Sequence, residues 1–277
     1  TTVQLHRPSA HVRIVTASSL FDGHDASINI MRRILQSQGA EVIHLGHNRS
    51  VDEVVTAALQ EDVQAIAVSS YQGGHVEYFG YMVELLRERG GERIQVFGGG
   101  GGVIVPSEIQ ALADRGVRIF SPEDGQRMGL QGMIGEMLMR ADVDLSADAP
   151  TSVHAIAGGG PAAWRALARL ITALEAGRAE APLLKSLHEQ AVRSTTPVIG
   201  ITGTGGAGKS SLTDELIRRL RLDQDDARRI AVISIDPSRR KSGGALLGDR
   251  IRMNAIAPWP KPPGTAAAGD GGQRVYM

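Results

Sequence analysis

The sequence predicts an α/β protein with two domains, and three observations support that prediction. From residue 11 to residue 140, short apolar runs alternate with helical patterns, as in a parallel sheet covered by helices. Glycines stand where the helices should end, at Gly39, Gly90 and Gly116. Another apolar run after residue 195 leads into a glycine-rich segment and a further helix. We therefore expect a five-stranded parallel sheet, then connecting helices, then the beginning of a second α/β domain.

Five βα units in succession make up the first domain. The expected strands are apolar on both faces, as in a buried parallel sheet, and are Val12–Ala17, Glu41–Leu45, Ala65–Ser69, Ile94–Phe97 and Val117–Phe120. The expected helices have apolar residues three and four apart, and are Ile28–Gln38, Val51–Glu61, Val76–Arg89, Ser107–Asp114 and Gln126–Arg140. Right-handed crossovers leave few topologies, and we expect the flavodoxin-like, Rossmann-like strand order 2-1-3-4-5.

The composition is that of an ordinary globular protein. The chain has 277 residues, of which 42% are apolar and 22% charged, enough for two domains. Thirty basic and thirty acidic residues cancel, so the net charge does not indicate a nucleic-acid or membrane partner. The chain has no cysteine, which excludes disulfides and thiolate chemistry. No apolar run approaches the roughly 18 residues of a membrane span, residues 1–10 lack the apolar core of a signal peptide, and we expect a cytoplasmic location.

Polar residues and glycines gather at the ends of three expected strands. Asp22-Gly23-His24-Asp25 follows the first strand, the segment 69–75 (SSYQGGH) follows the third, and five glycines, Gly98 to Gly102, follow the fourth. In the expected order, strands 1 and 3 are neighbours at the switch point where ligands bind beyond the carboxyl ends. Successive glycines let the backbone approach a large or flat ligand. The sequence therefore predicts a binding site at this edge.

Asp22 and His24 have the chemistry of a metal-binding relay. The carboxylate can accept a proton from one imidazole nitrogen, which fixes the tautomer and makes the other nitrogen a better metal ligand. No second histidine or thiolate lies at metal-ligand spacing, so a metal would arrive with most of its coordination filled, as in a macrocyclic cofactor. The alternative is that His24 simply enters a helix that Asp25 caps.

These residues resemble the base-off, His-on cobalamin-binding domains of methionine synthase and the methylmalonyl-CoA mutase group, whose pattern is DxHxxG, SxL and GG. The resemblance implies that His24 is the lower axial ligand of cobalt, hydrogen-bonded to Asp22, and that Ser69 contacts the displaced dimethylbenzimidazole tail. Ser27 stands where the pattern has glycine, and Tyr71, a further cofactor contact, stands where it usually has leucine. The glycines that would line the tail are Gly98, Gly99, Gly101 and Gly102, and either Gly98-Gly99 or Gly101-Gly102 is the family pair.

The second glycine-rich segment, residues 203–211, is a complete GxxxxGKS motif between an expected strand, Val198–Thr202, and an expected helix, Leu212–Leu220. This context is typical of a phosphate-binding P-loop. Lys209 would reach the β- and γ-phosphates, and Ser210 would ligate Mg²⁺. The expected nucleotide contacts are Gly203, Gly205, Gly206, Ala207, Gly208, Lys209, Ser210 and Ser211.

A further expected strand, Arg229–Ile235, ends at Asp236, which is either a magnesium carboxylate or a turn residue before proline. The segment from Asp236 to Met253 resembles the switch region of the GTPases that chaperone cobalamin mutases. That resemblance implies that Asp236 and Asp249 bind magnesium and act with Lys209 in hydrolysis. We interpret the basic run at residues 239–241 as a solvated surface.

We expect three segments: a cobalamin-binding domain at residues 1–142, linker and coupling helices at 143–195, and an incomplete GTPase domain at 196–277. The coupling helices are Pro161–Glu175 and Leu183–Arg193. The last segment is too short for a complete P-loop domain, so we expect more chain after it.

This order of domains resembles the fused acyl-CoA mutases. The resemblance implies an adenosylcobalamin-dependent radical rearrangement of isobutyryl-CoA and n-butyryl-CoA, and a GTPase using GTP with Mg²⁺ that gates cofactor loading. The acyl-CoA would bind a mutase barrel not present in this chain, and we expect a homodimer with no nucleic-acid or membrane partner. The alternatives are a stand-alone cobalamin carrier with a GTPase chaperone, a flavodoxin-like signalling module, and a cobalamin-sensing regulator, for which no DNA-reading helix-turn-helix is visible.

Overall fold

The computed structural model describes residues 6–23, 26–235, 245–257 and 274–277. Two compact units share these residues, and each is described by itself. The first comprises Thr1–Asp144 and Asp236–Gly248, and the second Leu145–Ile235 and Asp249–Met277. His24, Asp25, Asp236 and the basic run at 239–241 lie outside the described residues.

The first unit is built on a parallel sheet with the strand order β5-β4-β3-β1-β2-β7. Its strands are β1 (Arg13–Ser19), β2 (Glu41–Arg49), β3 (Ala65–Ser69), β4 (Gln95–Gly99), β5 (Val117–Phe120) and β7 (Ala245–Leu247). All residues of β1 and β3 are buried, as expected for central strands covered on both faces. The predicted order 2-1-3-4-5 is confirmed, and it places the ends of β1 and β3 side by side, with Ser18 opposite Ser69.

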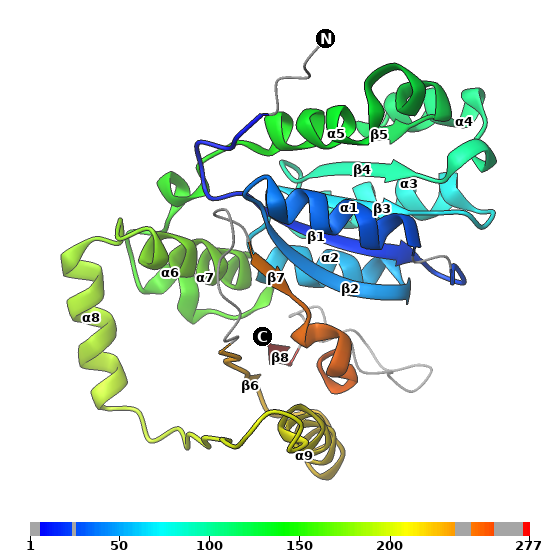
Figure 1. The fold of residues 1–277 in the computed structure, drawn as a ribbon. Coiled ribbons are helices and arrows are strands. Elements are labelled where there is room, and N and C mark those ends of the chain that lie inside the picture. Colours follow the sequence, from blue (N-terminus) through cyan, green and yellow to red (C-terminus); the bar gives the residue numbers. More distant parts are fainter. Residues whose placement is uncertain (1–5, 24–25, 236–244, 258–273) are drawn as a thin grey trace. The chain divides into compact units, whose positions relative to one another are not determined.

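Helices cover both faces of this sheet (Figure 1). The helices are α1 (Ala26–Ser37), α2 (Val51–Gln60), α3 (His75–Glu88), α4 (Pro106–Ala113) and α5 (Pro122–Ala141), with a 3₁₀ turn, η1 (Gly101–Val103), before α4. The helices α1 and α5 pack on one core through Leu35, Ile134 and Leu138, whereas α2, α3 and α4 pack on the other. The helix α5 is interrupted by a kink at Gly129, whose φ of 64° is not helical.

β7 is a sixth strand, added to the edge of β2. Its residues pair in parallel with Glu41, Val42 and Ile43 of that strand. The sequence motif had assigned this segment to the switch region of the nucleotide-binding domain. A short apolar run can pair with any free strand edge of suitable direction, so the motif alone does not determine which sheet receives it.

The second unit is mainly helical. Its elements are η2 (Leu145–Asp148), α6 (His154–Ala157), α7 (Gly160–Glu175), α8 (Ala181–Val192), α9 (Lys209–Asp223), β6 (Ile230–Ala231), η3 (Asp249–Arg252), η4 (Asn254–Ile256) and β8 (Val275–Tyr276). A small core contains Ile217 of α9, Met253, Ala255 and Val275. The buried Arg221 guanidinium stabilises it by donating to Asp226 Oδ1 at 2.7 Å and to the Ala255 carbonyl at 2.6 Å. Trp164 stacks on Tyr276, with ring centroids 5.0 Å apart.

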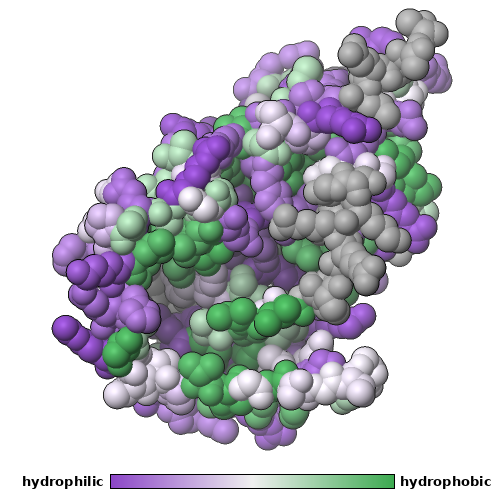
Figure 2. Space-filling view, turned by 60° about the vertical axis from the view of Figure 1, so that its left-hand side comes forward, coloured by the Kyte–Doolittle hydropathy of each residue, from purple (hydrophilic) through white to green (hydrophobic). Residues whose placement is uncertain are grey.

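Two strand predictions in this unit are wrong in the described residues. Residues 198–202 form no strand, and Val198 is 93% exposed. Of Arg229–Ile235 only Ile230 and Ala231 pair, with β8, and Ile233 is 90% exposed. An apolar run becomes a strand only when a neighbour accepts and donates its backbone hydrogen bonds. Figure 2 shows a face on which apolar side chains (green) lie among hydrophilic ones (purple).

In the part of the chain that the structure describes, every helix is too short or too polar to cross a membrane.

Candidate functional site

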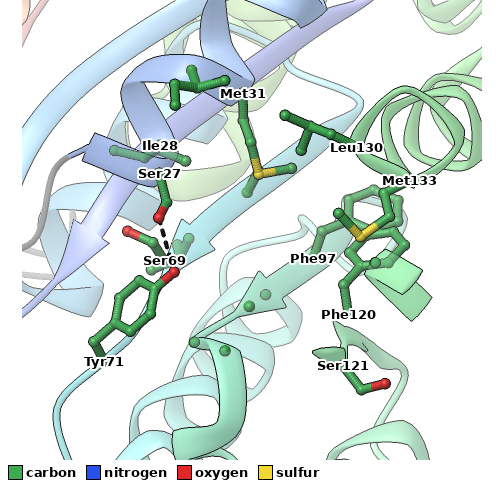
Figure 3. A pocket seen from close by; sticks show the side chains of 18 of the residues that line it. Ser27, Ile28, Met31, Ser69, Tyr71, Phe97, Phe120, Ser121, Leu130 and Met133 are labelled. Carbon is green, nitrogen blue, oxygen red and sulfur yellow. Dashed lines mark hydrogen bonds between the residues drawn. The ribbon is translucent and has the colours of Figure 1, made fainter. Parts of the chain in front are cut away.

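A cavity of about 320 Å³ opens in the first unit, between the carboxyl ends of β3, β4 and β5 and the helices α1 and α5. Its wall is mostly apolar: Phe97 and Phe120 stack with their centroids 6.2 Å apart, and Met31, Leu130 and Met133 complete it (Figure 3). Ser69, Tyr71, Ser27 and Ser121 supply the hydroxyl groups of the lining. Such a pocket, apolar with a few placed polar groups, is typical of a small-molecule or cofactor site.

Paired hydroxyls join the ends of β1 and β3 beside the cavity. Ser18 Oγ lies 2.9 Å from Ser69 Oγ, and Ser19 Oγ donates to Ser70 Oγ at 3.0 Å. All four serines are buried, so each pair satisfies polar atoms that water cannot reach. The predicted contact residue Ser69 therefore has a fixed position in the cavity wall.

Asp22 lies at the point where the loops after β1 and β3 meet. Its side chain is fully buried, and its Oδ2 accepts a hydrogen bond from the Tyr71 backbone nitrogen at 2.7 Å. Its own nitrogen donates to the Ser19 carbonyl at 3.0 Å. The preceding residue, Phe21, has a φ of 64° and donates its N–H to Asn48 Oδ1 at 2.8 Å. Asp22 is thus held rigidly two residues before His24.

The two departures from the family pattern contact each other. Ser27 Oγ, in the first turn of α1, lies 2.8 Å from the hydroxyl of Tyr71, which follows β3 (Figure 3). Both side chains are half-buried and both line the cavity. The sequence indicated each residue separately, but their hydrogen bond links positions 44 apart in the chain.

The glycine run serves two purposes. Gly98 and Gly100 are required by packing, because a Cβ would lie 2.5 Å from Phe79 Cζ at the first and 1.9 Å from the Ser70 carbonyl oxygen at the second. Gly99 and Gly101 line the cavity, and a Cβ on Gly101 would lie 3.4 Å from the Tyr71 ring. A Cβ on Gly102 would meet nothing within 4 Å, and Gly102 is not among the cavity residues.

An ion pair between Arg118 and Asp124 positions the start of the helix α5, which forms part of the cavity wall. Arg118 Nη1 donates to Asp124 Oδ2 at 2.9 Å, and Asp124 also accepts from the Ser121 nitrogen at the start of the helix. The Arg118 hydrogen bond is the main reason that the pKa of Asp124 is lowered from its usual value. The ionised carboxylate thus fixes the turn from which Ser121 and Pro122 face the cavity.

The P-loop of the second unit has left-handed glycines before its helix. Gly206 and Gly208 have φ values of 79° and 77°, and α9 begins at Lys209. The residues from Gly203 to Gly208 are exposed, and Ser210 and Lys209 are half-buried. Lys209 Nζ donates to the Thr204 carbonyl at 2.8 Å, so the ammonium folds back over the loop whose backbone would hold phosphates.

Asp249 begins η3 and accepts a hydrogen bond from the Ser234 hydroxyl. Its predicted partner at magnesium, Asp236, lies outside the described residues. Among the described residues, no group of three or more His, Asp or Glu side chains could hold a metal ion. The predicted cobalt and magnesium assignments therefore stay predictions.

Residues 12–126 match the protein family described as the B12 binding domain. Residues 167–263 match the family described as Methylmalonyl Co-A mutase-associated GTPase MeaB. The 2-hydroxyisobutanoyl-CoA mutase small subunit of Aquincola tertiaricarbonis is 36% identical over 39% of this chain, which covers 77% of that relative. The chain therefore belongs to the B12-binding acyl-CoA mutase family.

Longer matches identify the relatives that this chain resembles over most of its length. A fused isobutyryl-CoA mutase from Cupriavidus metallidurans is 75% identical over 90% of the chain, and one from Nocardia farcinica is 63% identical over 91%. The chain spans 23% of the length of each of these two relatives.

Proposed function

We propose that this chain is the cofactor-handling part of an adenosylcobalamin-dependent acyl-CoA mutase, and that its substrate pair is isobutyryl-CoA and n-butyryl-CoA. The observation that carries the proposal is the combination of a B12-binding match and a GTPase match in one chain. The substrate comes from the relatives' names alone. The acyl-CoA would bind a mutase barrel elsewhere, since separate small subunits exist among the relatives.

The residues of the first unit fit a corrinoid with a displaced nucleotide tail. Asp22 is buried two residues before His24 in the sequence and could hold its imidazole in one tautomer, so that the other nitrogen binds cobalt. The apolar cavity lined by Phe97, Phe120 and the glycines suits a flat aromatic base, and Ser69 offers a hydroxyl at its edge. Gly99 and Gly101 keep the backbone wall free of side chains.

When bound, adenosylcobalamin supplies a radical by homolysis of its cobalt–carbon bond. The contribution of this chain is to bind and orient. His24 would hold cobalt from below, and Asp22 would retain the imidazole proton at the other nitrogen. The apolar side chains around the cavity would exclude water from the tail.

The second unit would bind GTP with Mg²⁺ and gate loading of the cofactor. The backbone amides of residues 203–208 would hold the phosphates, and Lys209 would exchange its contact with Thr204 for the β- and γ-phosphates. Ser210, Asp236 and Asp249 would ligate the metal, with Ser211 as a further phosphate contact. We further propose that residues 1–142, 143–195 and 196–277 are the functional segments, and that the complete protein is a cytoplasmic homodimer without nucleic-acid or membrane partners.

The visible spectrum of cobalamin mixed with the purified chain tests the first site. We expect the base-off, His-on spectrum with the wild type and its loss with His24→Ala. A matched control is His188→Ala, since His188 lies on α8 in the other unit. An unchanged spectrum for His24→Ala would contradict the axial ligand assignment.

A fluorescent GTP analogue tests the second site. Lys209→Ala should weaken its binding at least about 100-fold, because the ammonium would compensate two phosphate charges. Lys185→Ala, on α8, is the matched control and should bind like the wild type. Equal affinity of Lys209→Ala and the control would show that the loop does not bind GTP as proposed.

A further inference from the structure

We propose that the hydrogen bond between the hydroxyls of Ser27 and Tyr71 is a latch that opens when the nucleotide tail of a cobalamin enters the cavity. This inference rests on the proposed function. It gives a role to the two residues that depart from the family pattern and whose 2.8 Å contact no sequence motif predicts.

The latch lies on the path that a tail would have to take. A ligand that enters the cavity from the end of α1 that follows His24 in the sequence would pass the first turn of α1 and the residues that follow β3. Ser27 belongs to that turn, three residues after His24, and Tyr71 belongs to the second segment. Both line the cavity (Figure 3), so their bond joins the two walls between which the tail would enter.

The Tyr71 side of the latch is positioned from two directions. Its backbone nitrogen donates to Asp22 Oδ2 at 2.7 Å. Its ring lies against Gly101, where an added Cβ would come within 3.4 Å of Tyr71 Cε1. Asp22, the proposed partner of His24, is therefore also the residue that sets the position of the latch. The Asp22 carboxylate thus takes part both in positioning the latch and in the proposed binding of cobalt.

The Ser27 side of the latch lies at the start of a helix. Ser27 is the second residue of α1. The same helix contributes the apolar Ile28 and Met31 to the cavity wall. When the bond opens, the serine and tyrosine hydroxyls regain hydrogen bonds from water or from the polar ribose and phosphate of the tail. Opening therefore exchanges the Ser27–Tyr71 hydrogen bond for hydrogen bonds to water or to the tail.

The test measures association rates by stopped-flow absorbance with two ligands. Adenosylcobalamin carries the nucleotide tail, and adenosylcobinamide lacks it. We expect Tyr71→Phe and Ser27→Ala each to increase the association rate of adenosylcobalamin between about twofold and tenfold, the effect of one lost hydrogen bond. The double variant should be no faster than either single variant, because all three lack the same bond. Association of adenosylcobinamide should not change.

Matched control variants are available in the same unit. Ser37→Ala removes an exposed hydroxyl at the other end of α1, and Tyr81→Phe removes one from α3, where Tyr81 is 51% exposed. Both should associate at the wild-type rate. Circular dichroism checks that every variant is folded.

Three results would overturn the latch. Unchanged rates would show that the bond does not limit entry. Slower association or faster release would show that the hydroxyls are contacts to the tail. Equal acceleration with adenosylcobinamide would show that the variants loosen the whole site. If the wild type bound neither ligand, the proposed cobalamin function itself would be contradicted.

Discussion

At the scale of single residues, Asp22 has two roles that depend on the same buried carboxylate. It holds the backbone of Tyr71, and it stands two positions before the proposed cobalt ligand. A buried carboxylate that accepts a backbone N–H is costly to remove, because the donor is left without a partner. Its presence in the sequence motif is therefore explained by the loop structure as well as by the proposed chemistry.

Gly100 is the residue whose replacement we expect to be most damaging in the glycine run. Gly100→Ala would produce a collision, because the new Cβ would lie 1.9 Å from the Ser70 carbonyl oxygen. We expect a loss of at least ~2 kcal/mol in the free energy of unfolding, measured by urea denaturation.

Gly102→Ala is the matched control, because nothing lies within 4 Å of its added Cβ. Its free energy of unfolding should change by no more than ~0.5 kcal/mol. Equal stability of the two variants would show that Gly100 is not constrained by the Ser70 carbonyl as described.

At the scale of elements, the helices α3 and α4 begin at fixed points. Glu108 accepts from the Val105 nitrogen at the start of α4 and lies 3.1 Å from His75 Nε2 at the start of α3. His75 Nδ1 lies 2.9 Å from the Gln72 carbonyl oxygen. The two loops that follow β3 and β4 are thereby tied to each other beside the cavity.

The start of α5 should make stability depend on pH. The folded-state pKa of Asp124 is lowered, chiefly by the hydrogen bond from Arg118. Its stabilising effect is therefore complete above the unfolded pKa of about 3.9 and is lost as the pH falls through the lower folded value. Asp124→Asn should cost about 1 kcal/mol at pH 7, and the difference from the wild type should disappear in acid.

Urea denaturation at a series of pH values from about 2 to about 7, a range that includes the carboxyl pKa values, measures this effect. The control is Asp114→Asn, since Asp114 is exposed and its carboxylate accepts a hydrogen bond from the neighbouring Gln110 side chain. A constant difference between Asp124→Asn and the wild type over the whole range would contradict the role of the ionised carboxylate.

At the scale of the whole molecule, the two units should respond to different ligands. We expect two thermal transitions by calorimetry. A corrinoid at about 100 times its dissociation constant should stabilise the first unit by ~2.7 kcal/mol and leave the second unchanged, and GTP with Mg²⁺ should do the reverse. Two variants are the controls. His24→Ala should remove the stabilisation by the corrinoid, and Lys209→Ala should remove the stabilisation by GTP. A single thermal transition whose midpoint is shifted by either ligand would contradict the expectation that the two units unfold independently.

The predictable part of the fold is the part that depends on local pattern. The bounds of Ala65–Ser69 and Val117–Phe120 were predicted without error, because a buried apolar run between turn residues needs no information from elsewhere in the chain. The order of the five strands followed from the handedness of their crossovers.

What the sequence could not predict depends on distant partners. The bond from Ser27 to Tyr71 joins two elements whose spacing is set by the folded sheet. Val198–Thr202 has a strand pattern but no paired neighbour among the described residues, so it does not form a strand. The role of Gly100 was also missed, since its packing partner, Ser70, lies in another loop.

The pairing of β7 with β2 also determines where the chain can be divided. The first unit takes its outermost strand from residues 245–247, although its other strands end at Phe120. A fragment cut after Asp144 would lose that strand and present the row of backbone groups of β2 to other molecules. Such an open strand edge favours edge-to-edge association of identical copies. The strand that covers this edge thus comes about a hundred residues after Asp144 in the sequence, although it belongs to the same unit.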